Sequence, residues 1–157
     1  MPNFLDSADA VYFHWQVPLT SETPGDVNQM MAGLVPMLDL LDSQTERFNH
    51  PLWIGIEYAS VRGGAAACPP APDGSCRPIE LFEAGQDVDP DLEVALGEQA
   101  DAINAVLLAT YARPNIQGFF LRGFNPSAVL WDKSSSTYGK PAEDVLRYWY
   151  PHLNLDS

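Results

Sequence analysis

The sequence is short of basic residues, and this shortage excludes several kinds of partner. Only 8 Lys and Arg residues stand against 21 Asp and Glu residues, which gives a formal net charge of −13. Such an acidic chain repels phosphate groups, so we expect neither nucleic acid nor an anionic membrane surface as a partner. No apolar run approaches the ~20 residues that a membrane-spanning helix needs. With 46% hydrophobic residues among 157, the composition predicts one globular domain.

Cysteine is also scarce. The two cysteines, Cys68 and Cys76, bracket a proline-rich segment that contains an Asp-Gly turn. Such a segment folds back readily, so it predicts a disulfide and with it an oxidising compartment, while two free thiols are the alternative. No histidine or second cysteine pair lies nearby at the spacing of zinc ligands, so we expect no metal and no other cofactor.

Strand-like and helix-like patterns alternate along the chain. Segments rich in β-formers are bounded by turn residues, and between them apolar residues recur at helical spacing. The predicted strands are 10–17, 52–58 and 116–121, and the predicted helices are 26–45, 89–111 and 141–150. This order predicts an α/β fold built from right-handed parallel βαβ units.

Several residues set the expected ends of these elements. Asp26 is a predicted N-cap of the first helix, and Asp89 followed by Pro90 predicts the start of the second. Pro36 predicts either a kink in the first helix or its division into two shorter helices. The segment 61–88 is long, irregular and rich in Gly, Pro and Ala, and loops of this length in a compact domain are usually functional.

One carboxylate stands out because of its place in the pattern. The apolar run 52–56 leads directly into Glu57. Buried parallel strands of α/β enzymes often present a catalytic group at their C-terminal ends, so Glu57 is a candidate catalytic residue. A solvated glutamate, or one that is simply paired with an arginine, is the alternative.

Four segments of the chain, taken in order, resemble the end of a TIM-barrel glycoside hydrolase of clan A, most nearly the family 113 endo-mannanase-like group. They are PLWIGIEYAS at 51–60, the Glu98-Gln99 pair, PNIQGFFL at 114–121 and YGKPAEDVLRYWY at 138–150. The resemblance implies that residues 1–157 form a single partial barrel domain, the C-terminal three βα units (strands six to eight) of a (β/α)8 TIM barrel.

The resemblance also implies a chemistry. Glu57 would be the nucleophile of a retaining enzyme that degrades a β-linked polysaccharide such as mannan. A retaining glycosidase needs two carboxyl groups about 5–5.5 Å apart, and the acid/base glutamate that the family carries on strand four has no counterpart in this sequence. We therefore expect the chain to be inactive alone and to need the missing N-terminal barrel half, or a second copy of the chain, as its partner.

The residues expected to contact the carbohydrate ligand are Tyr58, His14, Trp15, Arg122 and Trp131. Arg122 is also a candidate charge partner that keeps Glu57 ionised. The family usually has a tryptophan near the end of strand eight, and Trp131 is the candidate substitute here. Packing in the core is the alternative for His14 and Trp15.

Two further expectations concern location and class. An extracellular or cell-envelope location would require a signal sequence upstream, because the opening residues MPNFLDS have neither the basic nor the apolar region of a signal peptide. The alternative function is a non-catalytic α/β carbohydrate-binding or assembly module, with the Cys68–Cys76 loop as a contact surface.

Overall fold

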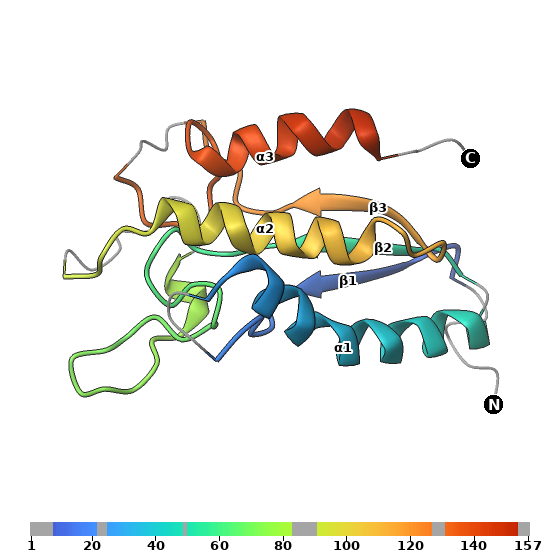
Figure 1. Cartoon of the computed structure of the whole chain (residues 1–157), viewed down its shortest axis with the longest axis horizontal. Coiled ribbons are helices and arrows are strands. Elements are labelled where there is room, and N and C mark those ends of the chain that lie inside the picture. The colour runs from blue at the N-terminus through green and yellow to red at the C-terminus, as the bar shows by residue number, and fades with distance from the viewer. Residues whose placement is uncertain (1–7, 22–24, 49, 83–90, 127–130, 154–157) are drawn as a thin grey trace.

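The computed structural model describes residues 8–21, 25–48, 50–82, 91–126 and 131–153. Strands and α-helices alternate along these segments (Figure 1). The elements are β1 (Val11–Trp15), α1 (Val27–Phe48), β2 (Leu52–Ile56), the 3-10 helix η2 (Ile79–Phe82), α2 (Leu96–Thr110), β3 (Ile116–Leu121), α3 (Pro141–Trp149) and the 3-10 helix η3 (Tyr150–His152).

The three strands form one parallel sheet in the order β1-β2-β3. Trp15 lies opposite Ile56, and Ile56 lies opposite Leu121, so the strands end at the same edge. In Figure 1 the arrowheads point to the end where the long loops gather, and α3 ends at the other end. The predicted α/β fold of parallel βα units is confirmed.

The sheet has a closed face and an open face. Leu52, Ile54 and Ile56 are fully buried in the core that the strands share with the helices. Residues at the alternate positions of the three strands point to the other face of the sheet. Two of them, Tyr12 on β1 and Phe120 on β3, are half exposed. On this open face the Tyr12 ring fills the space where a side chain at position 55 would be, which accounts for Gly55 in the middle of β2.

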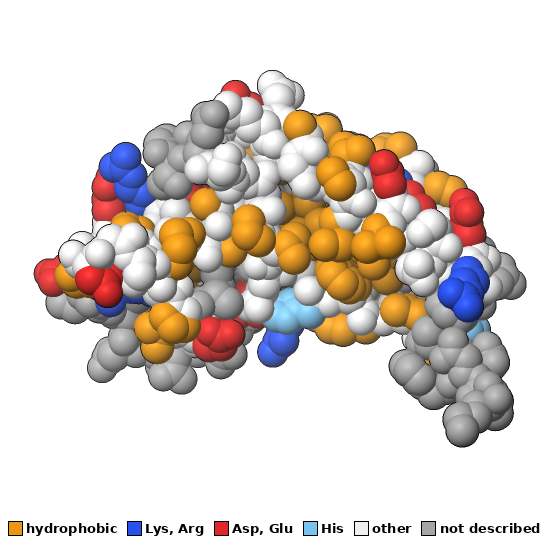
Figure 2. Space-filling view, turned by 90° about the horizontal axis from the view of Figure 1, so that it is seen from below, with side chains coloured by type: hydrophobic (Ala, Val, Ile, Leu, Met, Phe, Trp, Pro, Cys, Tyr) orange, Lys and Arg blue, Asp and Glu red, His pale blue; other side chains and the backbone are white. Residues whose placement is uncertain are grey.

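The outer side of β1 is likewise apolar. Figure 2 shows the molecule from the side on which β1 and α1 lie, and hydrophobic side chains gather over its middle. Val11, Phe13 and Val17 belong to the residues at the margin of the core that are only partly buried. Because β1 is an edge of the sheet formed by the described strands, its outer side pairs with no other described strand.

The structure decides details of two predicted helices. Of the two forms predicted for the first helix, division at Pro36 is wrong, since α1 runs without a break through it. Asp26 does cap it: the Gln29 backbone N–H donates to the Asp26 carboxylate at 2.9 Å, and the Asp26 N–H donates back to the Gln29 side chain at 2.9 Å.

The second helix begins later than predicted, at Leu96 rather than near Asp89 and Pro90, which lie outside the described residues. The residues just before Leu96 pair with the chain that follows β2 instead. Val94 forms an antiparallel bridge with Val61, and the Ala95 N–H donates to the Ser60 carbonyl at 2.9 Å. This pairing occupies backbone groups that a longer helix would need.

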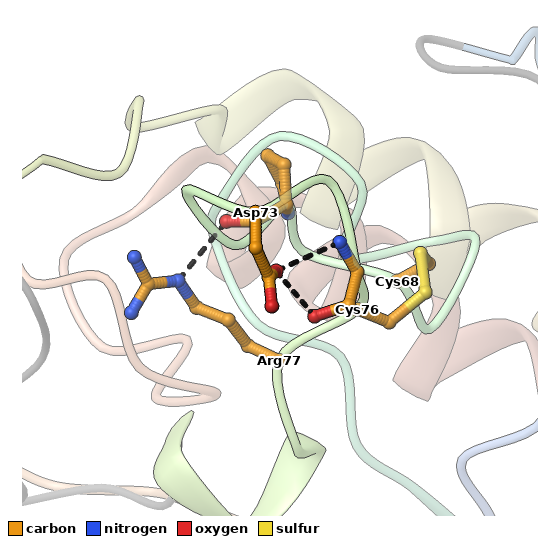
Figure 3. Close-up of a disulfide and its surroundings, with 6 residues drawn as sticks. Cys68, Asp73, Cys76 and Arg77 are labelled. Atoms are coloured by element: carbon orange, nitrogen blue, oxygen red, sulfur yellow. Dashed lines mark hydrogen bonds between the residues drawn. A yellow bond between two sulfur atoms is a disulfide. The ribbon is translucent and has the colours of Figure 1, made fainter.

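The predicted disulfide between Cys68 and Cys76 is present, with the two Cα atoms 4.6 Å apart (Figure 3). Asp73 shapes the turn between the cysteines, since its carboxylate accepts hydrogen bonds from the Ser75 N–H at 3.0 Å and the Ser75 hydroxyl at 2.7 Å. These bonds lower the pKa of Asp73. None of the helices in the described segments combines the length and the apolar character that a membrane span requires.

Candidate active site at the end of the middle strand

Glu57 follows the last residue of β2, at the edge of the sheet where all three strands end. Its backbone N–H donates to the Trp15 carbonyl at 3.3 Å, which continues the pairing with β1 by one residue. Alternation from Ile56 turns the Glu57 side chain to the open face of the sheet. The residue is only 6% exposed, so its carboxylate needs partners from the protein.

Three side chains from three different segments surround this carboxylate. The Ser135 hydroxyl donates to Oε1 at 3.0 Å. His14 Nε2 lies 2.9 Å from Oε2, and Arg122 Nε lies 3.8 Å from the same oxygen. His14 comes from β1 and Arg122 from the residue after β3, so the sheet itself brings both bases to the acid.

The contact between His14 and Arg122 indicates where the imidazole proton lies. Arg122 Nη1 is 3.3 Å from His14 Nδ1. A guanidinium can only donate, so Nδ1 acts as the acceptor, and a neutral imidazole then carries its proton on Nε2, facing Glu57. The direction of the Nε2 approach falls outside hydrogen-bond geometry, so the interaction with Glu57 is an electrostatic contact.

Two of the other expected ligand contacts, Trp15 and Tyr58, point away from this group. Trp15 is fully buried in the core, on the face of the sheet that the helices cover. Tyr58 is buried as well; its hydroxyl donates to the Val17 carbonyl at 2.8 Å, and burial raises its pKa well above the ordinary value. Alternation explains both positions, since each residue follows one that faces the open side. Trp131 lies in the loop before α3 and is 75% exposed.

Ser135 was not among the residues that the sequence singled out. It lies in a run of serines, 134–136, that matches no catalytic spacing, and it reaches Glu57 only through the folding of the loop between β3 and α3. Only the packed structure identifies it.

The arrangement provides a buried carboxylate at the mouth of the sheet. Among the described residues, no group of three or more His, Cys, Asp and Glu side chains could hold a metal ion. An ionised carboxylate that is shielded from bulk water, at the mouth of parallel strands, can attack an electrophilic carbon. Within the described segments, the hydrogen bonds and ion pairs of this carboxylate involve His14, Arg122 and Ser135, and no second carboxyl group.

Comparison with solved structures agrees with a partial barrel. A GH113 β-1,4-mannanase in a complex structure matches with a TM-score of 0.63 and 19% sequence identity, over 94% of this chain and 40% of its own. The GH113 β-mannanase AaManA from Alicyclobacillus acidocaldarius, in complex with ManMIm, matches with a TM-score of 0.62 and 23% identity, over 96% of this chain and 41% of its own. A further GH113 β-1,4-mannanase structure gives 0.58 and 18%, over 93% and 40%.

No protein-family model and no curated protein sequence matches the chain. The chain spans about 40% of the length of the mannanases whose structures it matches. At these identities the likeness is one of fold, and at that level it confirms the resemblance carried by the sequence motifs. The chain has the fold of part of a GH113 β-mannanase: three parallel βα units of an α/β barrel.

Proposed function

We propose that this chain is the C-terminal part of a retaining glycoside hydrolase that acts on a β-linked polysaccharide such as mannan, with Glu57 as its nucleophile. One observation carries the proposal: Glu57 directly follows the middle strand of the sheet, and its buried carboxylate is held by Ser135 on one oxygen and faces His14 with the other. The match to GH113 mannanases supports the substrate class.

The chemistry follows from the surroundings of the carboxylate. In a retaining mechanism one carboxylate attacks the anomeric carbon while a second carboxyl group protonates the leaving oxygen. In this proposal Glu57 is the attacking carboxylate, and His14 and Arg122 stand beside one of its oxygens. The chain does not itself supply the second carboxyl group at Glu57 in this proposal, so turnover requires an acid from elsewhere.

The expected ligand contacts divide into two groups. His14 and Arg122 stand at the carboxylate and are exposed enough to meet a sugar, and the exposed Trp131 offers an indole face for stacking on a pyranose. Trp15 and Tyr58, being buried, would act on the ligand only by supporting the strand ends from below.

The partner in this proposal is the remainder of a barrel, either the N-terminal half or a second copy of the chain. β1 and β3 are both edges of the sheet, and the open face carries the half-exposed rings of Tyr12 and Phe120. A closed barrel would pair these edges and bury these rings. The Cys68–Cys76 disulfide supports an extracellular or cell-envelope location.

Hydrolysis assays test the proposal. We expect the chain alone to release no reducing sugar from mannan and no phenol from phenyl β-mannoside, because these poor leaving groups need a proton donor that the proposed site lacks. Robust hydrolysis that disappears in the Glu57→Gln variant would show that an acid/base is present after all. Tight mannan binding that survives Glu57→Gln would instead favour a non-catalytic carbohydrate-binding module.

A further inference from the structure

The loop between β3 and α3 ends in a lysine whose side chain has no exposed surface. The Lys140 ammonium donates to the Ser60 hydroxyl oxygen at 2.9 Å and to the Ser134 carbonyl at 3.0 Å, and it lies 3.4 Å from the Asp132 carboxylate. An ammonium has three N–H donors, so all of them are used. Burying a lysine is costly unless it is paired in this way, so a fold that retains one has a use for it.

The Lys140 ammonium joins the segment that follows β2 to the loop that follows β3. Ser60 follows β2 on the same segment as Glu57, and its N–H donates to the Ser134 carbonyl at 3.2 Å while its hydroxyl donates to the Asp132 carbonyl at 2.8 Å. Lys140 binds at the centre of these contacts. The loop after β3 is thereby fastened to the chain just beyond Glu57.

The residue after Ser134 touches the proposed nucleophile. The Ser135 hydroxyl donates to Glu57 Oε1 at 3.0 Å, its N–H donates to the Phe82 carbonyl at 2.9 Å, and its own carbonyl accepts from the Gln99 amide at 3.2 Å. On its other side stands Gly123, at φ +86°, where any Cβ would come within 2.2 Å of the Ser135 hydroxyl. Ser135 is therefore held on every side, and its hydroxyl has little freedom to leave Glu57.

We propose that Lys140 is a positioning residue for Glu57: by binding the Ser134 carbonyl and Ser60 it fixes Ser135, whose hydroxyl holds one carboxylate oxygen in place. The other carboxylate oxygen, Oε2, then faces His14. A positioning role of this kind rests on the proposed function for its catalytic meaning, but the structural coupling can be measured without any substrate.

The test follows the Glu57 carboxyl carbon by NMR in protein labelled with 13C at the glutamate side-chain carboxyls. Glu57 is assigned as the signal missing from Glu57→Gln. The variants are Lys140→Met, which keeps the length of the side chain without its donors, Ser135→Ala, and the two combined. We expect both single changes to displace the Glu57 signal in the same direction, and the double change to add nothing further.

A matched control separates coupling from general destabilisation. Glu98→Gln alters another buried charged residue, one that binds the Gly63 and Ala65 backbone N–H groups, and should leave the Glu57 signal in place. If Lys140→Met does not fold, Ser60→Ala removes one partner of the ammonium and should displace the Glu57 signal in the same direction. The proposal is overturned if Ser135→Ala moves the signal while the folded Lys140→Met or Ser60→Ala variant does not, or if Ser135→Ala itself leaves it unchanged.

The outcome is independent of the proposed function. Even if Glu57 is not a nucleophile, these spectra show whether Lys140 and the Glu57 carboxylate are coupled. If the coupling fails, covalent capture of a sugar by Glu57 would still be observed.

Discussion

Two buried glutamates stand near the loops at the mouth of this sheet, and they are held in different ways. Glu98, at 7% exposed, accepts hydrogen bonds from the backbone N–H groups of Gly63 at 3.1 Å and Ala65 at 2.9 Å. Glu57 is as buried, but the described partners of its carboxylate are all side chains, those of His14, Ser135 and Arg122. Burial alone therefore does not identify a reactive carboxylate.

The type of donor distinguishes the two roles. Backbone donors belong to the fold, so a carboxylate that satisfies them stabilises a loop and is needed for the folded state. Side-chain neighbours such as a histidine and a half-exposed arginine can readjust when a ligand arrives, and the carboxylate beside them stays available for chemistry. The predictions below test this division, starting with the largest effect.

Replacing Glu98 should have the largest effect on stability. Glu98→Ala leaves the buried N–H groups of Gly63 and Ala65 without an acceptor, and we expect a loss of about 3 kcal/mol in the free energy of unfolding. Urea denaturation followed by circular dichroism measures it. Glu93→Ala is the control, because Glu93 pairs with Arg62 at the surface and should cost less than about 0.5 kcal/mol. Equal effects of the two changes would contradict the account.

A smaller effect should appear on acidification, at the loop that holds Ser135. Burial alone would raise the pKa of Asp132, but the hydrogen bonds from Ser134 and the charge of Lys140 outweigh it and hold the pKa below its ordinary value. As the pH falls, the unfolded chain then takes up this proton first, which favours unfolding.

The contribution of Asp132 is therefore fully present above the unfolded pKa, about 4, and is lost as the pH falls through the lower folded pKa. Wild type should lose more stability than Asp132→Asn between about pH 5 and pH 2. Urea midpoints at a series of pH values measure this, and parallel curves for the two proteins would show that Asp132 does not hold the loop through its charge.

The smallest effect on stability should come from the candidate catalytic residue itself. Glu57→Gln removes a buried charge while keeping the shape of the side chain and one acceptor oxygen, so we expect the free energy of unfolding to stay within about 1 kcal/mol of wild type. The same denaturation assay applies. A loss as large as that of Glu98→Ala would show that Glu57 also has a structural role, and it would contradict the proposed difference between the two glutamates.

Local patterns in the sequence were sufficient to predict the strands and the position of Glu57 after the second of them. Apolar runs and helical spacing depend on near neighbours, so the parallel βα order and the carboxylate after Ile56 could be predicted. The cap at Asp26 and the Cys68–Cys76 disulfide were predictable for the same reason, because each depends on a short stretch of chain.

What escaped prediction depends on contacts between distant segments. The late start of α2 results from the pairing of Val94 with Val61. Core packing is the alternative that the sequence leaves open for Trp15, and the burial of Trp15 and Tyr58 depends on which face of the sheet the helices cover. Ser135 reaches Glu57 across 78 positions of sequence, and no spacing indicates that contact.

The most direct test of the central claim, that Glu57 is a glycosidase nucleophile, is covalent capture of a sugar. With 2-deoxy-2-fluoro-β-mannosyl fluoride, a carboxylate oxygen bonds to the anomeric carbon as the carbon–fluorine bond breaks and fluoride leaves, so no second carboxyl group is needed. Capture accumulates with time, so it does not require measurable affinity in the chain alone. Peptide mass mapping should find a single fluoromannosyl group on Glu57 that is absent from Glu57→Gln, whereas labelling at another residue, or equal labelling of both proteins, would contradict the account.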